Sequence, residues 1–188
     1  MAAGDERGDA AAGPVLVGRQ VQLRPGRRGD AAQLHAILAE PSVSRWWGDP
    51  DPVPAIEEAL RGGDGSPVLL VVEAGGQVAG GIQYHEETDP MYRRAGIDIY
   101  LGSRFQGRGV GREAVALLAG YLFERRGHHR ITIDPAAANA QAIRCYTKVG
   151  FRPVGVMRQY ERGGDGRFHD GLLMDLLRGE LMSWLPTS

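Results

Sequence analysis

The sequence predicts an α/β (α+β) domain with a mixed central sheet of about six to seven strands and flanking helices. Short apolar runs with a period of two are typical of strands, and longer segments with apolar residues every three or four positions are typical of helices. Their expected order, β-α-α-β-β-β-α-β-α-β-β, differs from the regular βαβ alternation of a doubly wound fold.

Composition fits a soluble globular protein, because 43% of the 188 residues are hydrophobic and 24% are charged. The net charge of −1 argues against a nucleic-acid partner, and no apolar run reaches the roughly 18 residues of a membrane span. The amino end has no apolar core of a secretory signal, so we expect a cytoplasmic protein. The single cysteine, Cys145, excludes an internal disulfide and is expected to be a small buried side chain.

The amino-terminal part is expected to begin with a disordered tail. Residues 1–13 are mostly Ala, Gly and charged residues, so a single domain is predicted over 14–188. Residues 15–25 alternate apolar and polar side chains and predict a strand. The segment RGDAAQLHAIL then predicts a helix with Asp30 as its N-cap. SRWWGDPDPVP contains three prolines and predicts a loop, followed by a short helix over 54–61.

The middle of the chain predicts a hairpin, a strand and a long helix. Residues 68–73 and 77–85 flank Gly75-Gly76, which is the expected turn of the hairpin. AGIDIYLG, residues 95–102, alternates apolar with polar side chains and predicts the next strand. Residues 110–124 repeat apolar residues at helical spacing.

The carboxyl-terminal part predicts a strand over 130–134, a helix over 139–150 and a second hairpin. Gly150 is the expected left-handed stop of the helix. FRPVGVMRQY and RFHDGLLMDLL are the two hairpin strands, joined around RGGDG.

The segment QGRGVG, residues 106–111, lies between a predicted strand and a predicted helix. The N–H groups of a helix's first turn have no internal partner, and glycines let a phosphate approach the backbone closely. Arg108 and Arg112 add positive charge, so the segment predicts a pyrophosphate site; the alternative is a tight turn with solvated arginines. Its spacing does not fit a dinucleotide fingerprint, and no Lys-Ser/Thr pair follows as in a nucleotide P-loop.

Two motifs resemble the GCN5-related N-acetyltransferase (GNAT) superfamily. Gln106-x-x-Gly109-x-Gly111 matches its acyl-CoA motif, Q/R-x-x-G-x-G/A, and NAQAIRCYTKVGF, residues 139–151, matches a second family pattern downstream. RWWGD, EETDP, GID and DPAAANAQAIRCYTKVGF resemble aminoglycoside 6'-N-acetyltransferases of the antibiotic-resistance type. ERGGDGRFHDGLLMDLL is closer to family members that acetylate other amines.

The resemblance implies a fold whose strands splay apart around acetyl-CoA, the expected co-substrate. Backbone N–H groups of Ile99, Tyr100 and Leu101 would polarise the thioester carbonyl. Asn139 would bind the pantetheine arm, and Tyr146 would also lie against the cofactor. The pyrophosphate would be held by Gln106, Gly107, Arg108, Gly109, Val110, Gly111 and Arg112.

Two side chains are the catalytic candidates that this resemblance indicates. Asp98, on the polar face of the central strand, would take a proton from the ammonium of the substrate. The alternative is that Asp98 caps a bulge or pairs with Arg93 or Arg94. Tyr146 would protonate the departing thiolate, the alternative being a half-buried core tyrosine.

Acidic residues predict a polycationic amine as substrate. Glu86, Glu87, Asp89, Asp98 and Asp134 fall at the ends or polar faces of the predicted central strands. The alternative for the EETDP acids is a solvated turn.

Trp46 and Trp47 would pack a sugar or aminocyclitol ring, although one of the two is expected to be ordinary packing. No metal is expected, because His128-His129 lacks further ligands at the right spacing.

The expected function is therefore acetyl-CoA-dependent acetylation of an aminoglycoside, at the 6'-amine by resemblance, which would confer resistance. The first alternative is another amine: a protein N-terminus, a polyamine or a siderophore precursor. The second is a non-catalytic acyl-CoA-binding module, against which the pair Asp98 and Tyr146 argues. We expect a monomer or a homodimer, with no nucleic-acid or membrane partner.

Overall fold

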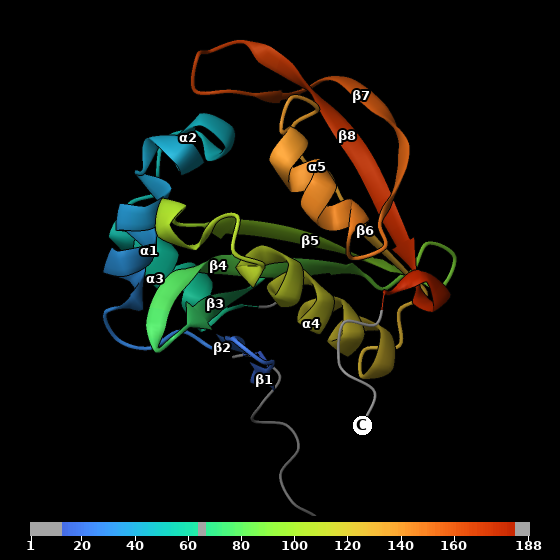
Figure 1. The fold of residues 1–188 in the computed structure, drawn as a ribbon, viewed down its shortest axis with the longest axis horizontal. Helices are drawn as coiled ribbons and strands as arrows, with labels where there is room; N and C mark the ends of the chain where they lie inside the picture. The colour runs from blue at the N-terminus through green and yellow to red at the C-terminus, as the bar shows by residue number, and fades with distance from the viewer. Residues whose placement is uncertain (1–12, 64–66, 183–188) are drawn as a thin grey trace, which may run out of the picture.

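The computed structural model describes residues 13–63 and 67–182 and contains an eight-stranded sheet with helices on both faces (Figure 1). The strand order is β1-β2-β3-β4-β5-β6-β8-β7, and every neighbouring pair is antiparallel except β5 and β6. The predicted mixed α/β architecture is confirmed. Residues 1–12 of the predicted tail lie outside the described residues, whereas Gly13 is buried against Leu70.

The predicted first strand is two short strands, β1 (Leu16–Val17) and β2 (Val21–Arg24), and this division raises the count to eight. A tight turn joins them, in which the Gly18 N–H donates to the Val21 carbonyl at 2.8 Å. The buried carboxylate of Glu113 reaches this turn from a distant helix and accepts three backbone N–H groups. The donors are Arg19 at 2.5 Å, Gln20 at 3.0 Å and Val21 at 3.3 Å.

Three helices follow, α1 (Asp30–Leu38), α2 (Pro41–Trp47) and α3 (Val53–Arg61). Asp30 is the first helical residue and not the N-cap, so that prediction was wrong: Gly29 occupies the cap position. The Asp30 carboxylate instead pairs with the buried Arg24 guanidinium at 2.7 Å.

The segment predicted as a proline-broken loop contains a helical turn, α2. Pro41 occupies its first position, where the missing N–H costs nothing, and Gly48 with φ 75° follows its last residue. Both tryptophans of RWWGD therefore lie on a short helix. That helix overhangs the sheet opposite the arm formed by the last two strands (Figure 1).

The predicted hairpin is β3 (Val68–Ala74) and β4 (Gln77–Glu87), with Gly75 and Gly76 both at positive φ in the turn. β5 (Arg94–Leu101) pairs with β4, and η1 (Ser103–Phe105) leads through the glycine segment into α4 (Val110–Glu124). These elements confirm the prediction within a few residues at each end.

The last elements are β6 (Arg130–Ile133), α5 (Ala140–Thr147), β7 (Arg152–Arg162), β8 (Phe168–Leu177) and the short η2 (Arg178–Glu180). The second hairpin is confirmed, and β8 is its inner strand, paired with β6. β7 lies at the sheet edge, and the β7–β8 hairpin extends beyond the sheet as an arm (Figure 1).

Two apolar cores cover the two faces of the sheet. The larger packs α4 and α5 against one face, and the smaller packs α1, α2 and α3 against β3 and Tyr100 on the other. Within the described residues, β5 and β6 pair only at Ala95–Ile131 and Gly96–Thr132. Beyond these two pairs the strands separate, and the edge of β5 from Ile97 to Leu101 is left without a ladder partner on that side. None of the helices in the described ranges is both long and apolar enough to cross a membrane.

Candidate active site

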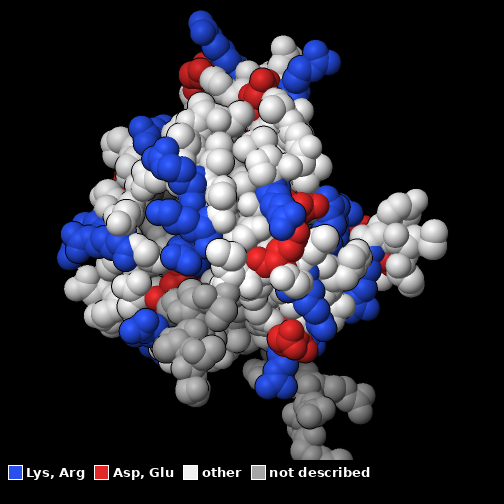
Figure 2. All heavy atoms as spheres, turned by 45° about the vertical axis from the view of Figure 1, so that its right-hand side comes forward, with Lys and Arg blue, Asp and Glu red and all other residues white. Residues whose placement is uncertain are grey.

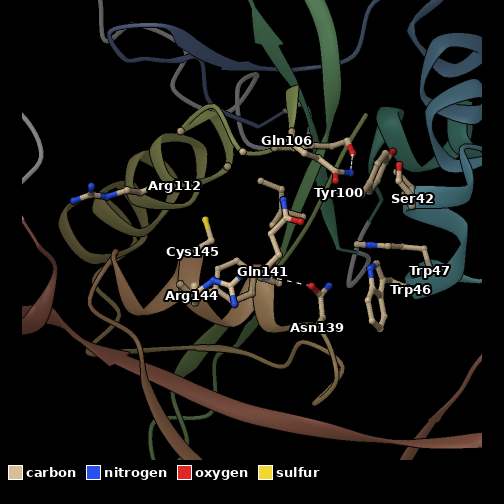
Figure 3. A pocket seen from close by; sticks show the side chains of 18 of the residues that line it. Ser42, Trp46, Trp47, Tyr100, Gln106, Arg112, Asn139, Gln141, Arg144 and Cys145 are labelled. Carbon is tan, nitrogen blue, oxygen red and sulfur yellow. Dashed lines mark hydrogen bonds between the residues drawn. The ribbon is translucent and has the colours of Figure 1, made fainter. Parts of the chain in front are cut away.

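A cavity of about 390 Å³ opens where β5 and β6 separate. β5 and the glycine segment form one wall, α5 forms the second, and α2 closes the far side. Figure 3 shows Trp46 and Trp47 on the side opposite Arg112 and Cys145. The lining includes Ile99, Tyr100, Leu101, Gln106, Gly107, Gly109, Gly111, Arg112, Asn139, Ala142, Arg144, Cys145, Tyr146 and Lys148.

The glycine segment is folded back onto the end of β5. The Gln106 amide donates to the Leu101 carbonyl at 2.8 Å (Figure 3), and both Gly107 and Gly109 have positive φ. α4 begins directly afterwards without a side-chain cap, so the N–H groups of its first turn remain available to an anion. A Cβ at Gly111 would lie 3.2 Å from Leu101, so glycine there lets α4 pack closely against the strand.

Positive charge gathers around this anion site. Arg112, Arg144 and Lys148 line the cavity, whereas Arg108 is exposed and lies outside its lining. On the face shown in Figure 2, basic and acidic side chains are otherwise interspersed, with a group of Lys and Arg at its left. A helix amino end, glycine backbone and three cations along one cavity are features that suit a diphosphate.

Asn139 caps α5, because its side-chain oxygen accepts the Ala142 N–H at 3.1 Å (Figure 3). The side-chain oxygen of Asn139 is thus engaged in the helix cap, and its amide nitrogen remains as a donor at the cavity wall. Tyr146 follows two turns later on α5 and is only 7% exposed. Burial, followed by the nearby Cys145 and Asp98, raises the pKa of Tyr146, so its hydroxyl stays neutral and able to donate.

A second cavity of about 230 Å³ adjoins the first, and the two share Trp46, Trp47, Ile99 and Tyr146 in their linings. Its polar lining is acidic: it contains the carboxylates of Asp98, Asp134 and Glu161. Two ligands, one in each cavity, would therefore come into contact beside Ile99 and Tyr146.

Asp98 is half-buried on β5, and its Oδ2 accepts a hydrogen bond from the Gln83 amide at 3.1 Å. Burial raises the pKa of Asp98 and the charge of Asp134 adds to that rise, while the Gln83 hydrogen bond opposes it. A carboxylate whose pKa lies above its usual range is a better proton acceptor near neutral pH. Within the described residues, neither Arg93 nor Arg94 forms an ion pair with Asp98.

Sequence reasoning missed Glu161. This residue comes from β7, whose register with β8 is interrupted by a bulge between Met157 and Glu161. Burial and the neighbouring Asp134 raise the pKa of Glu161. Next to Glu161, Tyr160 interacts with the carboxylate of Asp134, which raises the pKa of Tyr160 to about 12. A bulge resets the alternation of side chains, so no periodic signal in the sequence pointed to Glu161.

The acids of EETDP lie outside the linings of both cavities. Glu86 accepts hydrogen bonds from Arg126 at 2.7 Å and His128 at 2.6 Å. Burial acts to raise its pKa, but these partners outweigh burial and lower it. Glu87 and Asp89 form a turn, in which the Asp89 N–H donates to Glu87 at 3.0 Å.

The two tryptophans differ in their contacts. Trp47 is 40% exposed and packs edge-on against Tyr100, with ring centroids 4.9 Å apart. The guanidinium of Arg45 lies over the Trp46 ring at 4.9 Å. Both rings line both cavities, so α2 forms a shared aromatic wall.

An anion site joined to a buried tyrosine and an acidic pocket fits an acyl-CoA-dependent acyltransferase that acts on an amine. The model of the acetyltransferase (GNAT) domain matches residues 20–152, and the chain belongs to this family. It is therefore a GNAT N-acetyltransferase, and acetyl-CoA is its co-substrate. The predicted family, fold and co-substrate are confirmed.

Relatives of known activity fall into more than one substrate class. The chain is 31% identical over 157 residues to aminoglycoside N(6')-acetyltransferase type 1 of Klebsiella pneumoniae, covering 73% of this chain and 76% of that one. It is 27% identical over 168 residues to spermidine N(1)-acetyltransferase of Escherichia coli, covering 87% and 89%. A crystal structure of an aminoglycoside acetyltransferase in complex with coenzyme A superimposes with a TM-score of 0.69 at 27% identity, covering 85% and 96%.

Proposed function

We propose that this enzyme transfers the acetyl group of acetyl-CoA to the 6'-amine of an aminoglycoside and so confers resistance. The observation that carries the proposal is the cluster of Asp98, Asp134 and Glu161 in a cavity that joins the cofactor cavity. Partly buried carboxylates bind ammonium groups strongly, and several of them suit a substrate that carries several amines. Sequence similarity to the aminoglycoside enzyme of Klebsiella pneumoniae supports the same acceptor.

The proposed reaction is direct attack of the amine on the thioester. The acetyl-CoA diphosphate binds at the first turn of α4, beside Arg112, and the pantetheine arm runs along β5 and Asn139. Asp98 binds the ammonium group and removes a proton, which creates the neutral nucleophile. Backbone N–H groups of residues 99–101 stabilise the carbonyl oxygen as it becomes negative.

Tyr146 completes the proposed reaction. When the tetrahedral intermediate collapses, the bond between carbon and sulfur breaks and the coenzyme leaves as a thiolate. The Tyr146 hydroxyl donates a proton to that sulfur, and the second proton that the nitrogen loses restores the hydroxyl. Its burial and neutral state fit this role, because the donor must remain protonated until the thiolate forms.

The aromatic wall favours an acceptor that contains rings over a linear polyamine. Trp46 and Trp47 present flat apolar surface next to the acids, which suits the face of a sugar or aminocyclitol ring. Spermidine is the second candidate, favoured by the same three carboxylates and by the similarity to the Escherichia coli enzyme over 87% of the chain.

The deciding experiment measures thiol release from acetyl-CoA with kanamycin, tobramycin, spermidine and a peptide amine. We expect kcat/KM to be highest for an aminoglycoside, and NMR of the product should show the acetyl group on the 6'-nitrogen. Expression in a susceptible bacterium should raise the inhibitory concentration of the same drug. Turnover of spermidine or the peptide without turnover of any aminoglycoside would exclude the proposed acceptor.

A further inference from the structure

The overall reaction releases one proton that must reach solvent. A protonated amine and acetyl-CoA yield an amide, the free thiol of the coenzyme and H⁺, because the nitrogen loses two protons and the departing sulfur takes up one. Asp98, the proposed acceptor of the other proton, must give it up before each new turnover. Asp98 is half-buried, and a bound amine in the acidic cavity would cover it further.

One imidazole lies on the same face of the β4–β5 ladder as this carboxylate. In the β4–β5 ladder, Gln83 is opposite Asp98 and His85 is opposite Gly96. Alternate residues of a strand share a face, so Gln83, His85, Gly96 and Asp98 all lie on one face. His85 is exposed, so the pair runs from a half-buried acid to a solvent-accessible base.

Gly96 gives the imidazole its position. A Cβ built at residue 96 would collide with the His85 ring atoms Cε1 and Nε2, so the ring lies across the backbone of β5 where a side chain would otherwise stand. Gly96 and Asp98 are two residues apart on one strand, which places the ring next to the carboxylate along that face.

We propose that His85 receives the proton that Asp98 has taken from the amine and passes it to solvent. The Asp98 O–H bond breaks, a ring nitrogen of His85 gains the proton, and the imidazolium then loses it to bulk water. His85 is a positioning residue in the sense that it acts through Asp98 and not on the substrate. The inference rests on the proposed role of Asp98 and adds an exit for its proton.

The surrounding charges are compatible with this path. Asp98 is two residues from Gly96 on β5, and Asp134 directly follows the end of β6. Glu87 is the next residue on the same face of β4, and Arg94 is opposite Glu87. Burial is the main influence on the pKa of Asp98, and His85 is among the groups that act to lower it.

The test compares His85→Ala with the wild type at saturating acetyl-CoA, using whichever amine of the panel is acetylated fastest. In dilute, non-imidazole buffer we expect kcat/KM for the amine to fall about tenfold, somewhat less than the loss of a general base itself. Added imidazole should occupy the space over Gly96 and restore most of the rate. The Kd for coenzyme A should not change.

His129→Ala is the matched control, because His129 is an exposed histidine directly before β6 that lines neither cavity. Its rate should equal that of the wild type and should not respond to imidazole. An unchanged rate in His85→Ala in dilute buffer, or a loss that imidazole does not reverse, would overturn the relay. The proposed acceptor fails separately, when spermidine or the peptide is the fastest substrate and no aminoglycoside is acetylated.

Discussion

Replacing Asp98 by Asn should remove most of the acetyl transfer and leave the rest of the enzyme intact. Asn has nearly the same shape, and its amide oxygen can still accept the hydrogen bond that Gln83 donates at 3.1 Å. Only the ability to take a proton is lost. A positioned general base contributes 10²- to 10⁴-fold, so we expect kcat to fall at least ~100-fold, or about 2.7 kcal/mol in activation free energy.

The stability of the folded protein, unlike kcat, should not fall in Asp98→Asn. Burial raises the pKa of Asp98 in the folded state, so the group stabilises the fold at low pH and loses that contribution as the pH rises through the raised pKa. At pH 7 the folded protein therefore bears the cost of a charged, partly buried carboxylate. Asn lacks this cost, so the Tm of Asp98→Asn should equal or exceed that of the wild type.

Two measurements test whether Asp98 is the general base. Steady-state kinetics at saturating acetyl-CoA give kcat, and calorimetric titration with coenzyme A gives a Kd that should not change. Asp165→Asn is the control, because Asp165 is exposed in the β7–β8 turn and lines neither cavity. A kcat for Asp98→Asn within threefold of the wild type would refute the assignment of the base. A fall in Tm beside a lost rate would instead show a structural role.

Four further outcomes are expected. Tyr146→Phe should lower kcat by about tenfold or more with an unchanged KM for acetyl-CoA, because only the proton for the thiolate is lost; an unchanged kcat would contradict this. Glu161→Gln should raise KM about tenfold for a polycationic amine but not for a monoamine, since one ammonium contact of roughly 1.4 kcal/mol is removed. Gly109→Ala should weaken coenzyme A binding and lower stability by about 1–2 kcal/mol in chemical denaturation, because alanine is strained at φ 85°. The acid limb of kcat/KM against pH should lie above the ordinary aspartate pKa of about 3.9, because the base must be unprotonated and burial raises its pKa; the limb should vanish in Asp98→Asn.

Local patterns in the sequence predicted most of the fold because they are enforced by local physics. Gly75-Gly76 adopts the positive φ values that a two-residue hairpin turn needs, and the alternating segment 95–102 corresponds to β5, whose side chains contribute to both cores. The cofactor site stays a prediction, and it could be made from the sequence because its proposed N–H donors belong to consecutive residues. A single short segment, residues 106–111, is therefore enough to predict such a site.

The acceptor side was harder to predict because it depends on long-range packing. Glu86 carries the same charge as Asp98, but the fold places Arg126 and His128 against it and removes it from the cavities. Glu161 enters the cavity through a bulge that periodicity does not register. The α2 helix was missed because the prolines around it were interpreted as loop residues, although Pro41 at its first position favours a helix.

The hydrogen bonds between Glu113 and the β1–β2 turn connect the amino-terminal edge of the sheet with the proposed coenzyme site. Glu113 belongs to the first turns of α4, and its carboxylate accepts the backbone N–H groups of Arg19, Gln20 and Val21 in and next to the turn between β1 and β2. If that hairpin were displaced, the Glu113 carboxylate would lose these hydrogen bonds close to the N–H groups that we propose bind the diphosphate. A fusion partner or protease that disturbs residues 16–21 would thus act as an inhibitor of acetyl-CoA binding without touching the pocket.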